Sequence, residues 1–249
     1  MIINETPIIS VISVCYNCEN YIEKTILSLF NQSFKQYEYI IIDGGSTDKT
    51  LDIIKKLSRH FDKIDIISEP DRGIYDAMNK GVSRATGKYI YFLNIGDEFA
   101  DEFVLEKVLP FLKRDVAIYY GDIIWGNELR HSCGKATIGN LIYREQMICH
   151  QAIFAPTEAY RKYPFDLNYN ICADRDWILH SIKEGVPCIY MKNVVVAKYD
   201  LEGVSSNQDK FGVDSLRVTQ KYGGLLAVVF VKCKRAVGKM YRKIFGKES

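Results

Sequence analysis

The sequence predicts an α/β protein with a mostly parallel sheet and helices on both of its faces, and two observations lead to this prediction. Apolar, β-branched runs alternate with amphipathic helical segments through the first part of the chain. Polar side chains follow each of these runs at once, as expected where strand ends open onto a ligand site. Strand–helix alternation at this spacing is typical of βαβ units, whose parallel strands are buried on both faces.

The clearest elements come first in the chain. Apolar periodicity predicts strands over residues 8–14, 37–43, 64–69 and 89–93, with helices over residues 19–33, 46–58 and 74–87 between them. In the first helix, Ile22, Ile26 and Leu29 share one face, which is the pattern of a helix packed on a sheet. We therefore expect successive right-handed βαβ units.

The pattern becomes less regular in the second part of the chain. It predicts a helix at 101–114, a strand at 116–125, a helix at 174–185 and a strand at 187–199. Residues 126–170 are rich in aromatic side chains and show no clear period. Because no repeat or linker divides the chain, we expect one domain over residues 1–210, followed by a basic amphipathic helical tail over residues 211–249.

Composition narrows the class of protein. The net charge of +2 over 249 residues gives no reason to expect a nucleic-acid partner. No apolar run reaches the ~18–20 residues of a membrane span, and the start of the chain is typical of a first strand rather than a signal peptide. Seven cysteines, an odd number, favour a reducing cytoplasm over a disulfide framework. Cys15 and Cys18 have redox spacing, but a thioredoxin-like protein would leave the acids at later strand ends unexplained.

Polar residues follow the ends of all four predicted strands. They are Tyr16 and Asn17, then Asp43 with Gly44, then Asp71 with Arg72 and Gly73, and finally Asn94 with Asp97. Any single acid of this kind also fits a helix N-cap. Four successive strand ends with such residues favour one shared ligand site at this edge of the sheet.

The segments "SVISVCYNCENYIEKTILSLFNQSFKQYEYIIIDGGSTDKT", "EPDRGIYDAMNKGVSRATGKYIYFLNIGDEF" and "CADRDW" resemble the GT-A fold glycosyltransferases of family 2. Within that family they are most similar to the bacterial enzymes that assemble cell-surface polysaccharides. The resemblance implies a nucleotide-sugar-binding half over about residues 1–100 and an acceptor-binding half over about residues 101–210. It also implies inverting transfer of a sugar from a nucleotide-diphospho-sugar, by default a UDP-sugar, to an acceptor hydroxyl.

The resemblance places the nucleotide at the first two strand ends. It implies that Asp43 accepts a hydrogen bond from the ring N–H of the base, and that Tyr16 and Asn17 line the same pocket. Gly44 lets the chain turn tightly beside them.

Five further donor-site residues come from the motif after the third strand. The resemblance implies that Asp71, Arg72 and Gly73 form the next wall of the pocket, with Asp76 and Asn79 close to it. Arg72 is a candidate partner for the diphosphate, and a solvated turn arginine is the alternative interpretation.

The metal motif of the family is usually Asp-x-Asp followed by a further acid, and here it departs from that pattern. The corresponding residues are Asn94, Gly96 and Asp97, of which only Asp97 is a carboxylate. Because Mg²⁺ binds through one or two carboxylates together with substrate phosphates, Asp97 is the candidate ligand for Mg²⁺ or Mn²⁺. Asn94 and Gly96 remain candidate donor-site residues, and Gly96 leaves room for the sugar.

The motif "CADRDW" corresponds to the position of the catalytic base in the family. Asp174 is the first candidate for the base and Asp176 the second, since an inverting transferase needs one positioned group to deprotonate the acceptor. Asp174 also fits as the cap of the helix that follows. His150 is a further candidate, by resemblance near the donor sugar, the acceptor or the diphosphate, and a structural histidine is its alternative.

The last segment, residues 225–247, carries seven Lys or Arg and no acid, interleaved with apolar side chains. This pattern predicts an amphipathic helix on an anionic membrane surface, and the alternative is a helix packed on the domain with a solvated basic face. With the family resemblance, it implies a peripheral enzyme on the inner face of the bacterial plasma membrane. Its acceptor would be a glycan or a polyprenyl-diphosphate-linked sugar.

Two other functions compete with this prediction. A nucleotide-sugar pyrophosphorylase has a related sheet but needs a glycine- and arginine-rich phosphate loop after the first strand, where this chain has "CYNCENY". An inactive, transferase-like subunit that only binds a nucleotide-sugar is favoured by the depleted metal motif.

Overall fold

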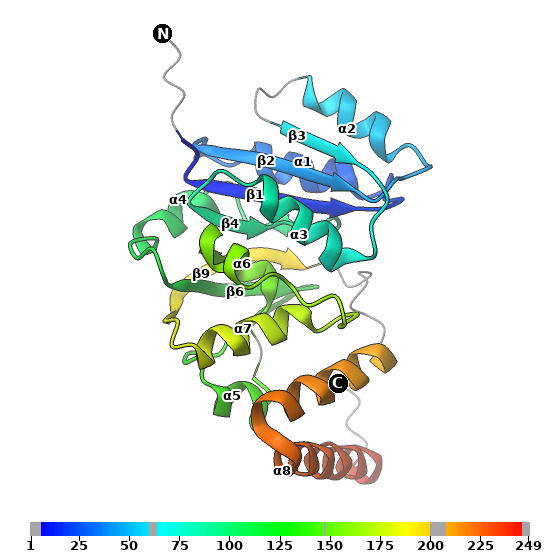
Figure 1. The fold of residues 1–249 in the computed structure, drawn as a ribbon, viewed down its shortest axis with the longest axis vertical. Coiled ribbons are helices and arrows are strands. Elements are labelled where there is room, and N and C mark those ends of the chain that lie inside the picture. Colours follow the sequence, from blue (N-terminus) through cyan, green and yellow to red (C-terminus); the bar gives the residue numbers. More distant parts are fainter. Residues whose placement is uncertain (1–5, 60–63, 147, 200–207, 246–249) are drawn as a thin grey trace.

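The computed structural model of the protein describes residues 6–59, 64–146, 148–199 and 208–245. Within them the chain forms one mixed sheet with helices on both faces (Figure 1). The order of its strands is β3-β2-β1-β4-β8-β6-β9-β5, with β7 paired to β6 at one side.

The first four strands are parallel to one another, as the alternating pattern predicted. They are β1 (Ile9–Cys15), β2 (Tyr37–Asp43), β3 (Ile64–Ser68) and β4 (Tyr89–Phe92). The helices between them are α1 (Ile22–Phe30), α2 (Thr50–Ser58) and α3 (Ile74–Arg84). In the register of the sheet Cys15 lies opposite Asp43, and Asp43 lies opposite Ser68. The three strands therefore end level, and the residues after them share one edge.

The second part of the sheet is mixed. Its strands are β5 (Glu98–Phe99), β6 (Ile118–Trp125), β7 (Glu128–Arg130), β8 (Ile153–Pro156) and β9 (Cys188–Tyr199). Strand β8 joins the two parts, because it runs antiparallel to both β4 and β6. It lies in the segment 126–170, where the sequence showed no clear period.

The remaining helices are short except for the last two. They are α4 (Val104–Val108), the 3₁₀ turn η1 (Leu109–Phe111), α5 (Ile138–Ile142), the 3₁₀ turn η2 (His150–Ala152), α6 (Thr157–Lys162), α7 (Ala173–Lys183) and α8 (Gln208–Phe245).

Each face of the sheet has its own hydrophobic core. On one face Met78 of α3, Tyr160 of α6 and Trp177 of α7 pack over the strands. On the other, Ile26 of α1 and Val104 of α4 do the same. Alternate residues of every central strand point to opposite faces, so these two cores fix which face of each strand its helices cover.

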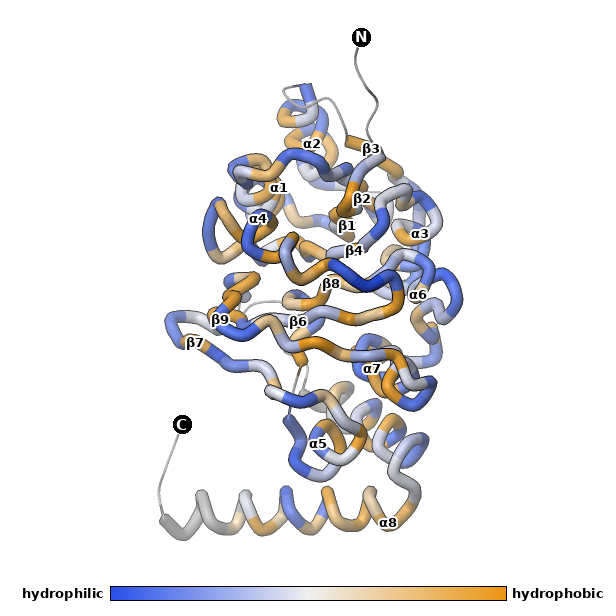
Figure 2. Tube along the Cα trace, turned by 90° about the vertical axis from the view of Figure 1, so that its left-hand side faces the viewer, coloured by the Kyte–Doolittle hydropathy of each residue, from blue (hydrophilic) through white to orange (hydrophobic). Residues whose placement is uncertain are grey.

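Helix α8 consists of two segments, since Gly224 has a left-handed φ of 73° and interrupts it. Figure 2 shows the second segment along the end of the molecule farthest from the N-terminus. The first segment is packed on the domain, with Val218 and Thr219 fully buried. Part of the segment predicted as a tail over 211–249 therefore contributes to the core of the domain.

Candidate active site at the carboxyl ends of the strands

The loops after β1 and β2 are tied to each other. Asn17, at a positive φ of 48°, accepts the backbone N–H of Thr47 on its side-chain oxygen at 2.9 Å. Its own backbone N–H donates to the hydroxyl of Ser46 at 2.8 Å. Tyr16 beside it is 63% exposed. The ring of Tyr16 is therefore exposed to solvent at the edge of a loop that hydrogen bonds hold in place.

Asp43 is fully buried and its carboxylate is saturated with donors from the protein. The backbone N–H of Ser46 (3.0 Å) and the hydroxyls of Ser46 and Ser68 donate to it. Burial by itself would raise the pKa of Asp43, but these hydrogen bonds outweigh it and hold the pKa below its ordinary value of 3.8. The charged carboxylate thus fixes the loop, and a hydrogen bond to a nucleotide base would have to replace one of these donors.

Asp71 approaches the same loop from the other side. A Cβ on Gly44 would lie 2.5 Å from Asp71 Oδ2 and 3.5 Å from the ring of Tyr16. A side chain at position 44 would therefore displace the carboxylate of Asp71 from this close approach. Asp71 Oδ1 accepts the backbone N–H of Gly73 at 2.8 Å, which leaves Oδ2 facing the Gly44 loop. The structure brings Tyr16, Gly44 and Asp71 together as one wall.

The other predicted donor residues differ in how they are used. The side chain of Arg72 is 77% exposed and forms an ion pair with Asp76 at 3.1 Å, and this pairing lowers the pKa of Asp76. Asn79 donates to the carbonyl and accepts the N–H of Phe165, both at 2.9 Å. Arg72 thus lies at the rim, whereas the amide of Asn79 holds the loop before α7.

The turn after β4 contains the predicted metal ligand. Gly96 has a φ of 102°, a conformation that side chains with a Cβ rarely adopt. Its N–H donates to Thr25 Oγ1 at 3.0 Å, and the Thr25 hydroxyl donates to the carbonyl of Asp97 at 2.9 Å. The backbone of this turn therefore accounts for glycine at a position where the family usually has an acid.

The oxygen atoms of this turn fit a divalent cation only in part. Asp97 is 4% exposed, and the side-chain oxygen of Asn94 is buried without a hydrogen-bond partner among the described residues. No group of three or more His, Cys, Asp or Glu suited to a metal occurs in the described part of the chain. Mg²⁺ commonly takes few protein ligands and completes its shell with water and substrate phosphates, so Asp97 suits a metal that arrives with the donor.

Asp174 lies at the start of α7 and faces two side chains from distant parts of the chain. Its Oδ2 is 3.3 Å from His150 Nδ1, and its Oδ1 is 3.1 Å from the hydroxyl of Tyr75. Burial would raise the pKa of Asp174, but hydrogen bonds from His150, the backbone of Arg175 and Tyr75 hold it below the ordinary value. The side chain keeps 21% of its surface exposed. Asp174 is thus an ionised carboxylate that can still reach a substrate.

His150 and Tyr75 complete the site. His150 Nε2 is 2.7 Å from the amide nitrogen of Asn94, so His150 connects the turn after β4 with α7. Burial and then the charge of Asp174 raise the pKa of Tyr75, which keeps its hydroxyl protonated. Tyr75 was not predicted from the sequence, although it lies between Gly73 and Asp76 in the donor motif. Its position in that motif was the available signal.

Asp176, the second candidate for the base, faces away from this site. It is buried and forms an ion pair with Lys221 of α8 at 2.8 Å. The hydroxyl of Tyr222 donates to its carbonyl at 3.1 Å. The geometry therefore favours Asp174 as the base.

Helix α8 also braces the start of α7. Asp214 accepts the backbone N–H groups of Asn170 and Ile171 at 2.7 and 3.0 Å, and the carbonyl of Ile171 accepts the hydroxyl of Tyr75. Arg175, the residue after Asp174, donates to Ser215 at 2.6 Å.

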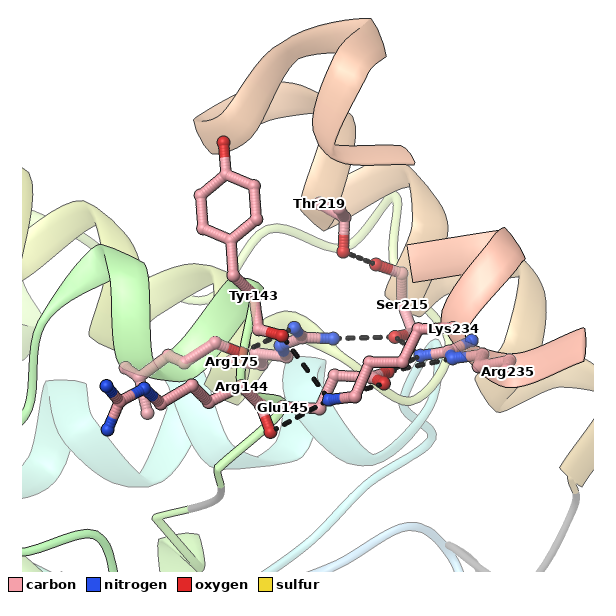
Figure 3. A network of polar contacts seen from close by, with 9 residues as sticks. Tyr143, Arg144, Glu145, Arg175, Ser215, Thr219, Lys234 and Arg235 are labelled. Carbon is pink, nitrogen blue, oxygen red and sulfur yellow. Dashed lines mark hydrogen bonds and ion pairs between the residues drawn. The ribbon is translucent and has the colours of Figure 1, made fainter. Parts of the chain in front are cut away.

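The same brace extends to the second segment of α8. Figure 3 shows Ser215 linked in turn to Arg235, which pairs with Glu145. These contacts therefore link the start of α7 to the segment that was predicted as a tail.

A family model described as "Glycosyl transferase family 2" matches residues 10–168. The chain belongs to this family. A PGL/p-HBAD biosynthesis glycosyltransferase of Mycobacterium bovis is 30% identical over 232 residues, which cover 91% of this chain and 90% of that protein. An uncharacterized glycosyltransferase of Haemophilus influenzae is 27% identical, over 79% of this chain and 66% of that protein. The protein is a glycosyltransferase, as the motifs predicted.

Solved structures agree on the fold. The structure of S. aureus TarS 1–349 in complex with UDP has a TM-score of 0.70 at 18% identity, over 86% of this chain and 64% of that one. The mannosyltransferase PcManGT from Pyrobaculum calidifontis, in complex with GDP-Man and Mn²⁺, has a TM-score of 0.66 at 16% identity, over 86% and 64%. These similarities confirm the predicted GT-A fold.

Asp43→Asn should destabilise the protein in a pH-dependent way. At neutral pH we expect a loss of about 1–3 kcal/mol in the free energy of unfolding, because buried donors lose a charged acceptor. Since the pKa of Asp43 is lowered on folding, its contribution is present above 3.8 and is lost as pH falls through the folded-state pKa. Urea unfolding at a series of pH values measures this, with the exposed Asp52→Asn as control. A gap between variant and wild type that does not narrow in acid would contradict the assignment.

Proposed function

We propose that this glycosyltransferase moves a sugar, with inversion, from a nucleotide-diphospho-sugar to a hydroxyl group of a glycan or a lipid-linked oligosaccharide. The observation that carries the proposal is Asp174, an ionised and partly exposed carboxylate held by His150 at 3.3 Å. It lies near the edge of the sheet where the loops after the parallel strands form a candidate donor pocket.

The residues divide the work between donor and acceptor. Tyr16 and Asp71 would contact the base of the nucleotide. Arg72 at the rim can turn toward the diphosphate. Asp174 accepts the proton of the acceptor hydroxyl while that oxygen attacks the anomeric carbon, and the bond from this carbon to the diphosphate breaks. A single displacement of this kind inverts the configuration. A divalent metal held by Asp97 would supply charge neutralisation to the leaving diphosphate.

UDP is the proposed donor nucleotide. In support, S. aureus TarS is described in complexes with UDP and with UDP-GlcNAc, and its fold matches this chain. Because PcManGT is described in complex with GDP-Man, a binding experiment must compare GDP with UDP.

A catalytically inactive nucleotide-sugar-binding subunit is the second candidate. The observation in its favour is the metal turn, in which Asn94 and Gly96 stand where acids are usual, and no three-ligand group occurs among the described residues. The position and ionisation of Asp174 favour the enzyme.

A panel of UDP-, GDP- and dTDP-sugars, incubated with the protein and bacterial membrane extract with and without Mn²⁺, tests the proposed function. We expect sugar transfer from a UDP-sugar, enhanced by the metal, and a thermal shift with UDP. Nucleotide binding without turnover across the whole panel would instead identify the binding subunit.

Substitutions of the three acids Asp174, Asp97 and Asp176 should affect different properties of the protein. Asp174→Asn should lower the rate of transfer by at least ~100-fold with little change in donor binding, because the base acts on the acceptor. Asp97→Ala should weaken donor binding and metal dependence together. Asp176→Asn should mainly lower thermal stability, because it breaks the ion pair of this buried carboxylate with Lys221. Steady-state kinetics and nucleotide titrations measure these effects, and wild-type turnover by Asp174→Asn would show either that Asp176 is the base or that the motif is misaligned.

The second segment of α8 supports the proposed location at the cytoplasmic face of the membrane. No described helix is long and apolar enough to cross a bilayer. Ala227 and Val231 face the domain and are fully buried. The opposite face leaves apolar side chains in water, namely Leu225, Leu226, Val229, Val237 and Met240.

Charge favours an anionic bilayer as the partner of this face. Residues 225–247 carry seven cations and no acid, and each cation close to an anionic surface contributes roughly 1 kcal/mol. Lys234 and Arg235 are engaged with Glu145, so attachment would rest on the other cations and on the apolar face. These terms are suited to reversible, salt-sensitive attachment near a polyprenyl-linked acceptor.

Replacing Leu226 and Val229 together by Gln should release the protein from anionic vesicles. Each side chain contributes about 1.5–3 kcal/mol when fully buried, so we expect at least a tenfold loss of vesicle binding in sedimentation, with donor binding unchanged. Val213→Gln, an exposed apolar position on the first segment, is the matched control. If wild type ignores anionic vesicles at low salt, α8 is a packed helix with a solvated basic face.

A further inference from the structure

His150 lies between two groups of the active site that the sequence motifs treat separately. Its Nε2 is 2.7 Å from the amide nitrogen of Asn94 in the turn after β4. Its Nδ1 is 3.3 Å from Asp174 Oδ2 at the start of α7. The side chains of His150 and Asp174 are similarly accessible, at 22% and 21%. One imidazole ring therefore connects the depleted metal motif with the candidate base.

With the amide nitrogen of Asn94 toward the ring, the two contacts determine which ring nitrogen carries a proton. An amide nitrogen only donates, so Nε2 must accept and carries no proton. A neutral imidazole then has its single proton on Nδ1, where it points at the carboxylate of Asp174. In this arrangement Asn94 selects the tautomer and His150 delivers the hydrogen bond.

Tyr75 cannot replace this contact. Its hydroxyl has one proton, for which the carbonyl of Ile171 and Asp174 Oδ1 compete. The N–H of His150 is the side-chain donor to Asp174 that is not shared with another acceptor among the contacts described.

We propose that His150 is a positioning residue for Asp174, and that Asn94 is an amide because only a donor at this place keeps the proton on Nδ1. A carboxylate at position 94 would accept from Nε2–H and draw the proton away from Asp174 or leave the ring charged. The proposal rests on the proposed function, in which Asp174 takes the proton of the acceptor hydroxyl. His150 keeps its own proton throughout and holds the carboxylate with a free lone pair toward the acceptor.

Two variants of His150 separate this role from mere packing. The amide nitrogen of Asn can occupy the place of Nδ1, whereas that of Gln reaches toward the place of Nε2. We expect His150→Asn to keep kcat within about tenfold of wild type, and His150→Gln to lose about 100-fold, as misplacement of a reacting group does. The KM for the donor should change little in either variant. Thermal melts of both variants show whether each one is folded.

The tautomer is measured directly and does not depend on turnover. In a ¹⁵N–¹H correlation spectrum of the full chain, His150 should show a proton on Nδ1 and none on Nε2. Loss of its signals in His150→Asn assigns it among the four histidines of the chain. Asn94→Asp, which offers Nε2 only an acceptor, should bring a proton to Nε2.

The outcomes distinguish the two proposals. If wild type transfers no sugar from any donor, the proposed function fails, and the tautomer of His150 still decides whether it donates to Asp174. A wild-type ring protonated at Nε2, alone or in addition to Nδ1, would overturn the positioning role. So would equal kcat in His150→Asn and His150→Gln, or a rise in donor KM at unchanged kcat, which would make His150 a donor-binding residue.

Discussion

An ionised carboxylate that is largely withdrawn from water must be hydrogen-bonded, and this constraint on Asp174 organises the active site. Its partners come from separate elements: Tyr75 on α3, His150 on η2 and the backbone of Arg175 on α7. These elements reach one another only because β8 joins the parallel and mixed parts of the sheet between β4 and β6. The mixed sheet thus brings the edge after the parallel strands close to Asp174.

The position of Asp174 also depends on an element outside the predicted domain. Asp214 fixes the loop before α7, Ser215 binds Arg175, and Lys221 pairs with Asp176. Since removal of one partner from a buried polar network leaves the other unpaired, the start of α7 depends on α8 for its polar contacts. The boundary predicted at residue 210 was based on the change in charge pattern along the sequence. These contacts join the segments on its two sides.

The sequence predicts those features that have local signals. Strands β1, β2 and β3 contain β-branched runs, and their level ends follow from parallel pairing, so the edge that their loops share was predictable. The short strand β8 and helices α5 and α6 were not, because a few residues contain too little of a period. Tyr75 and Asp174 are 99 positions apart, and Asp214 is 44 positions from Asn170, so these pairs depend on tertiary packing. The sequence pattern identified Asp43 as a candidate site residue. The hydroxyl and N–H groups that donate to its carboxylate could be identified only from the structure.

Helix α8 connects the chemistry to the proposed location. Its first segment contacts α7, the helix that begins beside Asp174. Its second segment, after Gly224, turns an apolar face outward. Arg235 of this second segment contacts Ser215 and Glu145. On the proposed membrane-bound orientation, the same helix lies on the lipid and braces Asp174. An acceptor carried by a membrane lipid would then be restricted to the layer of space next to the base. The binding energy of α8 on the lipid would thereby help to orient the acceptor hydroxyl. This orientation is the part of an inverting transfer that most depends on geometry.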